Sequence, residues 1–131
     1  MCELTLRNGL VVTPSGVVRG GIAIDGGIIT QIGPDVSLPR GDRDIDVDGK
    51  VLFPGLVDPH VHMGVPDSTR EKMESDFQTE SRDAAAGGVT TMITMTLFGE
   101  QSRLEVADMS LEAGDRFSQV DYRLTSVITK R

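Results

Sequence analysis
Short apolar runs alternate with turn-forming residues over the first part of the chain, up to residue 53. Runs of this kind, bounded by Gly, Pro, Asn or Asp, are typical of β-strands. Turns are expected at residues 8–9 (Asn-Gly), 13–16 and 25–27, where glycine or asparagine accepts a positive φ at little steric cost. The pattern therefore predicts a meander of short, twisted strands over residues 3–53.

Acidic and apolar residues alternate from Asp44 to Asp48. This period of two predicts a strand with one wet face and one buried face, and Ile45 and Val47 are expected on the buried face. The carboxylates here lack the spacing of an EF-hand, so a solvated strand face is favoured over a Ca²⁺ site.

Beyond residue 53 the pattern changes to longer apolar runs that alternate with amphipathic segments. Residues 56–62 are apolar on both faces, which is typical of a strand buried in a parallel sheet, and further strands are expected at 89–95 and 120–128. With helices between them, this order predicts parallel strands joined by right-handed crossovers. We therefore predict an α/β chain with a β-rich domain, 1–53, and a second domain, 54–131.

Both expected helices carry end signals. Ser75 with Gln78 forms a capping box, which predicts that the first helix begins there, after a loop over 63–74. Gly87-Gly88 predicts its end. Ser102 with Glu105 forms a second capping box, which predicts the start of the next helix.

Composition and charge narrow the class of protein. The chain has 131 residues, of which 38% are hydrophobic and 25% charged, as in globular proteins. Its net charge of -7 disfavours nucleic acid and anionic membranes as partners. Cys2 is the sole cysteine, and no apolar run approaches the roughly 20 residues of a membrane helix. A cytoplasmic protein is expected.

His60 and His62 are the only histidines, and they follow the apolar run from residue 56. Side chains two residues apart on a strand point to the same face, so both imidazoles can reach one site. Imidazole suits Zn, Ni, Fe or Cu, and a metal here would need further ligands from carboxylates, water, a modified side chain or another polypeptide. From the spacing alone, a hydrogen-bonded pair of core histidines explains the pattern equally well.

Residues 53–62 read Phe-Pro-Gly-Leu-Val-Asp-Pro-His-Val-His, and this stretch resembles the start of the catalytic barrel in the cyclic amidohydrolases. That family includes dihydropyrimidinase (D-hydantoinase), allantoinase and dihydroorotase. Residues 4–32 resemble the N-terminal β-sandwich strands of the family. Asp76-Phe77 and residues 84–91 (Ala-Ala-Ala-Gly-Gly-Val-Thr-Thr) resemble its first barrel helix and second barrel strand.

The resemblance implies β-sandwich strands joined to the first β/α units of an incomplete TIM-like (β/α)8 barrel. It implies two divalent metals per complete site, usually zinc, with His60 and His62 as ligands of the more buried one. A metal-activated hydroxide would hydrolyse a ring C–N amide bond of a small cyclic substrate. It also implies a homo-oligomer for the complete enzyme.

The residues around the histidines have two readings each. Asp58 either accepts backbone N–H bonds near the strand end or orients a histidine that holds the metal. Met63, Gly64 and Val65 either pack as an ordinary loop or line the substrate pocket, as the corresponding loop does in hydantoinase-like relatives.

The remaining ligands of the family cannot be located. A carboxylated lysine, two further histidines and the catalytic aspartate belong to later strands, and Lys130 falls one β/α unit too early. We therefore predict no catalytic residue here, and an N-terminal fragment or truncated gene product that is inactive alone. The alternative is a non-catalytic truncated homologue that acts as an interaction or oligomerisation module through open sheet edges.

Two positions bear on the substrate. Dihydroorotases usually carry an arginine where this chain has Gly64, and an asparagine after the second barrel strand, where it reads Thr-Met-Thr-Leu-Phe over 94–98. A hydantoin or dihydropyrimidine ring with an apolar substituent is therefore favoured over an acidic ring.

Overall fold
The computed structural model describes residues 1–97 and 101–126. The chain forms two compact units, Met1–Pro54 and Gly55–Arg131. Lys130 and the expected strand end at 127–128 lie outside the described residues, as does Phe98.

The first unit is a five-stranded sheet, and its connectivity differs from a simple meander. Its strands are β1 (Cys2–Thr13), β2 (Gly16–Asp25), β3 (Ile28–Gly33), β4 (Gly41–Asp46) and β5 (Val51–Leu52). The first three pair antiparallel, whereas β4 and β5 both run parallel to β1. The chain therefore crosses back after β3, through a short 3-10 turn at Asp35–Ser37, instead of continuing outward.

The predicted turn at Asn8-Gly9 is wrong, because β1 runs through it. The register between β1 and β2 shifts between Leu6 and Gly9, and Asn8 has a φ of 57°. The Asn8 side chain donates to Asp46 at 2.8 Å. The left-handed conformation that asparagine tolerates is thus used for a β-bulge. Hydrogen bonds from the Asp48 N–H and from Asn8 lower the pKa of Asp46.

The sheet of this unit is covered on one face and open on the other. Ala23 and Cys2 are buried with Leu38, whose segment lies over that face. On the other face Ile32 pairs with Ile22, and Leu6 pairs with Ile45 across the sheet. Ile45 is 38% exposed, so its predicted burial is wrong. The reason is that, within the described residues, no second layer of this unit covers the face that carries Ile22, Ile32 and Ile45.

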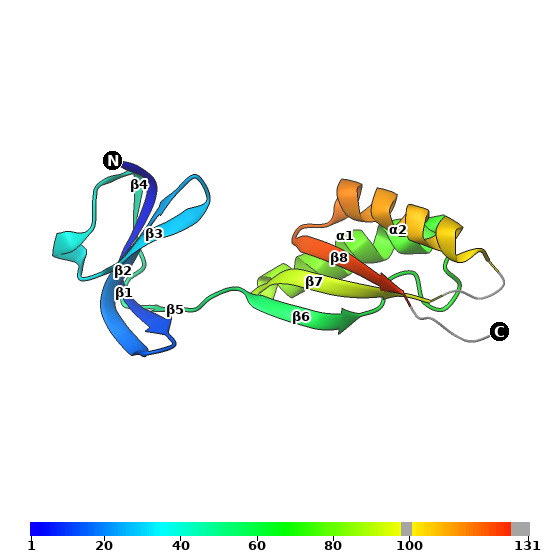
Figure 1. The fold of residues 1–131 in the computed structure, drawn as a ribbon, viewed down its shortest axis with the longest axis horizontal. Coiled ribbons are helices and arrows are strands. Elements are labelled where there is room, and N and C mark those ends of the chain that lie inside the picture. The colour runs from blue at the N-terminus through cyan, green and yellow to red at the C-terminus, as the bar shows by residue number, and fades with distance from the viewer. Residues whose placement is uncertain (98–100, 127–131) are drawn as a thin grey trace. The chain divides into compact units, whose positions relative to one another are not determined.

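The second unit has the predicted parallel α/β architecture. It contains β6 (Leu56–Val61), α1 (Arg70–Ala86), β7 (Val89–Thr96), α2 (Arg103–Phe117) and β8 (Asp121–Ser126). The three strands pair parallel in the order β6-β7-β8. Both helices lie on the same side of this sheet (Figure 1). Their core consists of Met63, Met73, Phe77, Met92, Val106 and Ala113.

Helix α1 begins earlier than predicted. Its N-cap is Thr69, whose hydroxyl accepts the Lys72 N–H, so Ser75 lies inside the helix and residues 70–74 are not a loop. The competing capping site at Thr69 lengthens the helix and adds Met73 to its buried face. The end at Gly87-Gly88 is as predicted, and so is the capping box of Ser102 with Glu105 on α2.

Strand β6 is more exposed than its apolar sequence predicts. Leu56 and Val57 are 56% and 59% exposed. This corrects the expectation of a strand buried on both faces, and the reason is that β6 lies at an edge of its sheet.

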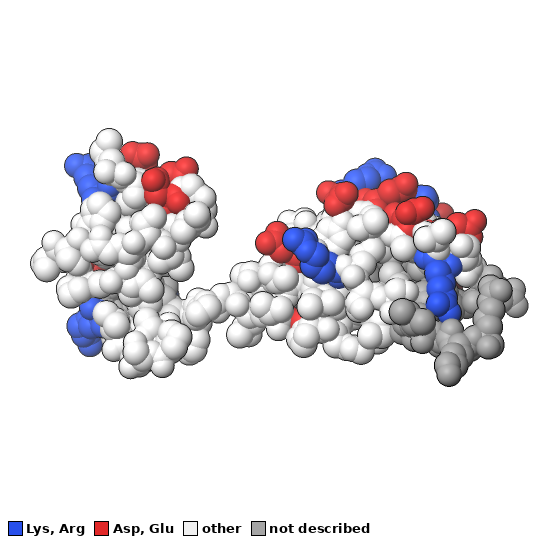
Figure 2. Space-filling model, viewed as in Figure 1, with Lys and Arg blue, Asp and Glu red and all other residues white. Residues whose placement is uncertain are grey.

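Charged side chains gather over the helices of the second unit, on the face that Figure 2 shows. The ion pairs Arg70–Glu112 and Arg116–Glu74 join α1 to α2. Because these pairs are exposed, each contributes little to stability. In the described part of the chain, no helix is long and apolar enough to cross a membrane.

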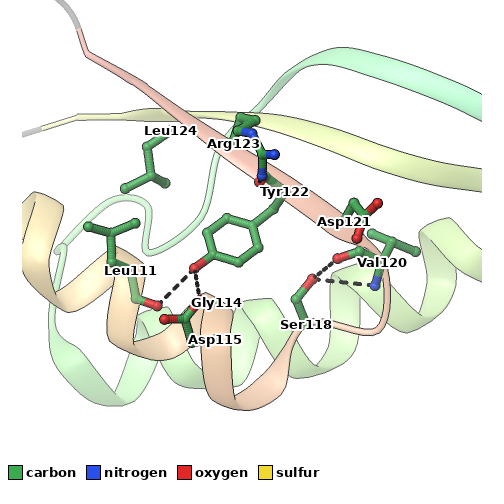
Figure 3. Close-up of a pocket in the computed structure, with 9 residues that line it drawn as sticks. All are labelled: Leu111, Gly114, Asp115, Ser118, Val120, Asp121, Tyr122, Arg123 and Leu124. Atoms are coloured by element: carbon green, nitrogen blue, oxygen red, sulfur yellow. Dashed lines mark hydrogen bonds between the residues drawn. The ribbon is translucent and has the colours of Figure 1, made fainter.

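Tyr122 joins β8 to both helices. Its ring meets the Phe77 ring edge-on with centroids 5.3 Å apart. Its hydroxyl lies 2.6 Å from Asp115 Oδ1 and 3.0 Å from the Leu111 carbonyl oxygen, beside a cavity of about 420 Å³ (Figure 3). The ring rests on Gly114, where an added Cβ would come within 2.3 Å of Tyr122 Cζ.

We expect Gly114→Ala to destabilise the second unit. Alanine gains helix propensity worth about 1 kcal/mol, but the overlap with the Tyr122 ring is expected to reverse the sign and cost about 1–3 kcal/mol net. Denaturant unfolding followed by the fluorescence of Tyr122, the sole tyrosine, measures the change. Asp108→Ala, at an exposed position of the same helix, is the control. An unchanged unfolding free energy would contradict the tight contact.

Stability is expected to fall above pH 10 through Tyr122. Burial, and then the hydrogen bond to Asp115 and its charge, raise the pKa of Tyr122 from 10.0 to about 12. A raised pKa means that the fold favours the neutral phenol. The stability that the neutral Tyr122 phenol contributes to the fold is therefore complete below pH 10 and is lost as the pH rises toward 12. Ultraviolet absorbance of the single tyrosinate measures this pKa, and a value near 10 would contradict it. Tyr122→Phe should remove this part of the alkaline loss.

Candidate functional site
His60 and His62 lie together at the carboxyl end of β6. The two Nε2 atoms are 3.1 Å apart, and the ring centroids are 4.9 Å apart with an interplanar angle of 84°. Both side chains are exposed, whereas Val61 between them packs against the core cluster. The period of two along the strand thus brings both imidazoles to one side of the backbone, as the spacing predicts.

The distance between the two nitrogens suits a shared metal ion. Two nitrogens each about 2.0–2.1 Å from one tetrahedral ion lie about 3.3 Å apart. The observed 3.1 Å is close to this value. Without a metal, one neutral imidazole can donate an N–H bond to the other across the same distance, so the geometry serves both forms.

The described residues do not form a complete metal site around the two histidines. Over 1–97 and 101–126, no group of three or more His, Cys, Asp or Glu side chains is placed to hold an ion. Two imidazoles are half of a tetrahedral set. A metal at His60 and His62 would need its other ligands from water or from further protein groups.

Asp58 contacts the backbone beside the histidines. Its Oδ1 accepts the N–H of His60 at 3.0 Å. This is the first of the two roles predicted for Asp58, a carboxylate that satisfies a backbone donor near the strand end. Its second predicted role, orienting a histidine ring that holds the metal, stays a prediction.

The loop after His62 is divided between core and surface. Met63 is 4% exposed and belongs to the core cluster, whereas Val65 is 37% exposed. Gly64 is buried with a φ of 76°. His62, Met63 and Val65 share a hollow of about 430 Å³ with residues of α1, which we call the β6 hollow. That this loop lines a substrate pocket stays a prediction.

Sequence reasoning missed the role of Asp76. This carboxylate is 7% exposed and lines the β6 hollow, where it binds the N–H of Gly64 and the ammonium of Lys72. The available signal was its position between Met73 and Phe77, because residues three and four apart share a helix face. A start of the helix at Ser75 concealed that spacing.

Similar proteins were found by sequence. An allantoinase of Streptomyces avermitilis is 44% identical over 96 residues, which are 72% of this chain and 21% of that protein. An allantoinase of Enterococcus faecalis is 36% identical over 121 residues, 91% of this chain and 26% of that protein. A D-phenylhydantoinase of Escherichia coli is 37% identical over 97 residues, 74% and 21% of the two chains. The chain thus spans about a quarter of the length of these curated relatives. No family model matches it.

Similar solved structures agree. A D-hydantoinase (dihydropyrimidinase) from Thermus sp. has a TM-score of 0.74 and 31% identity, over 93% of this chain and 27% of that one. An L-hydantoinase (dihydropyrimidinase) from Arthrobacter aurescens has a TM-score of 0.74 and 28% identity, over 95% and 27%. The resemblance and the fold class predicted from sequence are confirmed. Sequence and fold together show that the chain belongs to the cyclic amidohydrolase family and corresponds to its N-terminal portion.

Proposed function
We propose that this chain contributes the first metal ligands to a cyclic amidohydrolase that hydrolyses a C–N amide bond in a ring. His60 and His62 hold a divalent metal, zinc, through their Nε2 atoms. The observation that supports this most directly is the 3.1 Å separation of those atoms at the carboxyl end of a parallel strand. In barrels built from such units, this is the end that carries the active site.

The metal supplies Lewis-acid chemistry when bound, because it polarises a carbonyl and lowers the pKa of a coordinated water. The chain's own residues hold and orient it. His60 and His62 donate the nitrogen ligands, and Asp58 holds the backbone of His60 in place. The segment Met63, Gly64 and Val65 forms one wall of the substrate pocket.

The substrate we propose is a small ring of the hydantoin or dihydropyrimidine type. Gly64 provides no cation for an acidic ring, because glycine has no side chain, and its N–H already donates to Asp76. The names of the relatives point the same way, because allantoin and phenylhydantoin both contain a hydantoin ring.

Two imidazoles are only part of the ligand set that the proposed hydrolysis needs. The chain's two histidines are the only ones in the sequence, and no third metal-binding side chain joins them among the described residues. We therefore propose that the chain alone is inactive. For the complete enzyme we propose two metals per site, a homo-oligomeric assembly and a cytoplasmic location. The sole cysteine, Cys2, fits a reducing compartment.

A second candidate function has its own support. Leu56 and Val57 are exposed on β6, and β6 and β8 are both edges of their sheet. Open edges with apolar side chains pair readily with other strands. In this alternative the chain is a non-catalytic interaction or oligomerisation module. It would be metal-free and oligomeric by light scattering.

We expect the purified chain to bind Zn²⁺ or Co²⁺ weakly and through its histidines. His60→Ala and His62→Ala should each weaken binding at least about tenfold, because each removes one of two protein ligands. Calorimetry with Zn²⁺ and visible absorption with Co²⁺ measure the affinity. Asp42→Asn, at an exposed carboxylate of the first unit, is the matched control. Equal affinity in all four proteins would contradict the proposed ligands.

Hydrolysis of hydantoin is expected only in combination with a longer partner polypeptide. Co-expression with the part of a hydantoinase that this chain does not cover should yield a complex that binds zinc tightly and opens hydantoin rings. The same complex made with His60→Ala should have little of either property. An active complex with dihydroorotate as the faster substrate would contradict the proposed substrate, and an inactive, metal-free oligomer would favour the interaction module.

A further inference from the structure
Asp76 is the one acidic or basic side chain that is buried among the residues the structure describes, with 7% of its surface exposed. It lies on α1 between Met73 and Phe77, which belong to the core cluster. A buried carboxylate is costly unless its oxygens are paired and hydrogen-bonded. The carboxylate of Asp76 therefore needs a partner for each of its two oxygens.

Both oxygens of Asp76 are in use. Oδ2 accepts the N–H of Gly64 at 2.9 Å, and Oδ1 accepts from the ammonium of Lys72, one turn earlier on the helix. Gly64 is two residues beyond His62. The helix therefore holds the backbone immediately after the second imidazole.

The rest of the loop is tied down from Gly64 onward. The Ser68 N–H donates to the Gly64 carbonyl oxygen at 2.6 Å, and the Ser68 hydroxyl donates to the Leu97 carbonyl oxygen, just after β7, at 3.0 Å. Thr69 then caps α1. The loop thus has fixed points on α1 and beside the end of β7, and Asp76 provides the one nearest to His62.

Strand pairing alone does not extend to His62. The last residue of β6 is Val61, which pairs with Thr94, and the register with β7 shifts between Asp58 and Val61. In this irregular segment the His60 N–H is held by a carboxylate, that of Asp58. Asp76 does the same for the backbone beyond His62. Each imidazole therefore has a carboxylate that fixes the chain next to it.

We propose that Asp76 is a positioning residue for metal binding. By holding the Gly64 N–H, it keeps the backbone of His62 in the orientation that brings the two Nε2 atoms together. Lys72 balances the buried charge of Asp76 and keeps its carboxylate turned toward the loop. This inference rests on the proposed function, because it takes His60 and His62 to be metal ligands.

The test compares Co²⁺ affinity, by visible absorption, in Asp76→Ala, Asp76→Asn and wild type. Residues that support a ligand typically change metal affinity about 10–100-fold when removed, and we expect a loss of this size for Asp76→Ala. Asp76→Asn should lose less, because its amide oxygen can still accept from Gly64. Asp83→Asn is the matched control, since Asp83 lines the same β6 hollow from α1 but is exposed. It should stay within about twofold of wild type.

Hydrogen exchange of the Gly64 amide gives a readout independent of the metal. In Asp76→Ala this amide should exchange at least about tenfold faster, while the amides of β7 keep their protection if the unit is folded. If Asp76→Ala does not fold, Asp76→Leu, which is close to aspartate in size and also offers Gly64 no acceptor, carries both measurements. Faster exchange with unchanged Co²⁺ affinity would overturn the positioning role and leave a structural one. Unchanged exchange would overturn the contact itself.

The two proposals fail in different ways. If wild type binds Co²⁺ no better than His60→Ala, the proposed function fails and the metal-positioning role of Asp76 fails with it. Exchange at Gly64 then still decides whether Asp76 holds the loop. If His60→Ala abolishes binding but Asp76→Ala does not weaken it, only the inference about Asp76 fails.

Discussion
The parallel pairing of β6 with β7 is the constraint on which the candidate site depends. Strands that run in the same direction bring their carboxyl ends to one edge of the sheet, and the chain must cross back through a helix. The loop after His62 therefore lies between the start of α1 and the end of β7 and can be tied to both, through Asp76 and through the Leu97 carbonyl oxygen. His60 and His62 face each other because of strand geometry, and the carboxylates of Asp58 and Asp76 hold the backbone around them.

Each unit covers one face of its sheet and leaves apolar side chains exposed elsewhere on the sheet. The helices cover β7 and bury Met92, but Leu56 and Val57 on β6 are exposed. In the first unit, Ile29 and Ile32 are 55% and 44% exposed. Apolar patches of this kind usually mark contact surfaces. The proposed metal site has the same character, since the described residues place only two candidate ligands there. Both features support the proposal that function requires further polypeptide.

The sequence by itself determined the features whose causes are local. The turn at residues 25–27, the end of α1 at Gly87-Gly88 and the capping box at Ser102 were all predicted, because the residues that form each signal are neighbours along the chain. The parallel α/β order followed from the same local patterns. The convergence of His60 and His62 followed from the strand period alone.

Only the tertiary structure decided the features whose partners are distant in sequence. Asn8 forms a bulge instead of a turn, and its side chain binds Asp46, which lies 38 residues away. Asp76 is buried, and its carboxylate accepts the N–H of Gly64, which lies 12 residues earlier. The period of two in the sequence shows that the strand around Ile45 has two different faces. Whether another layer covers either face depends on the rest of the fold, and Ile45 is exposed. Local pattern therefore specified the elements and the pair of imidazoles, whereas burial and the support of the loop came from long-range contacts.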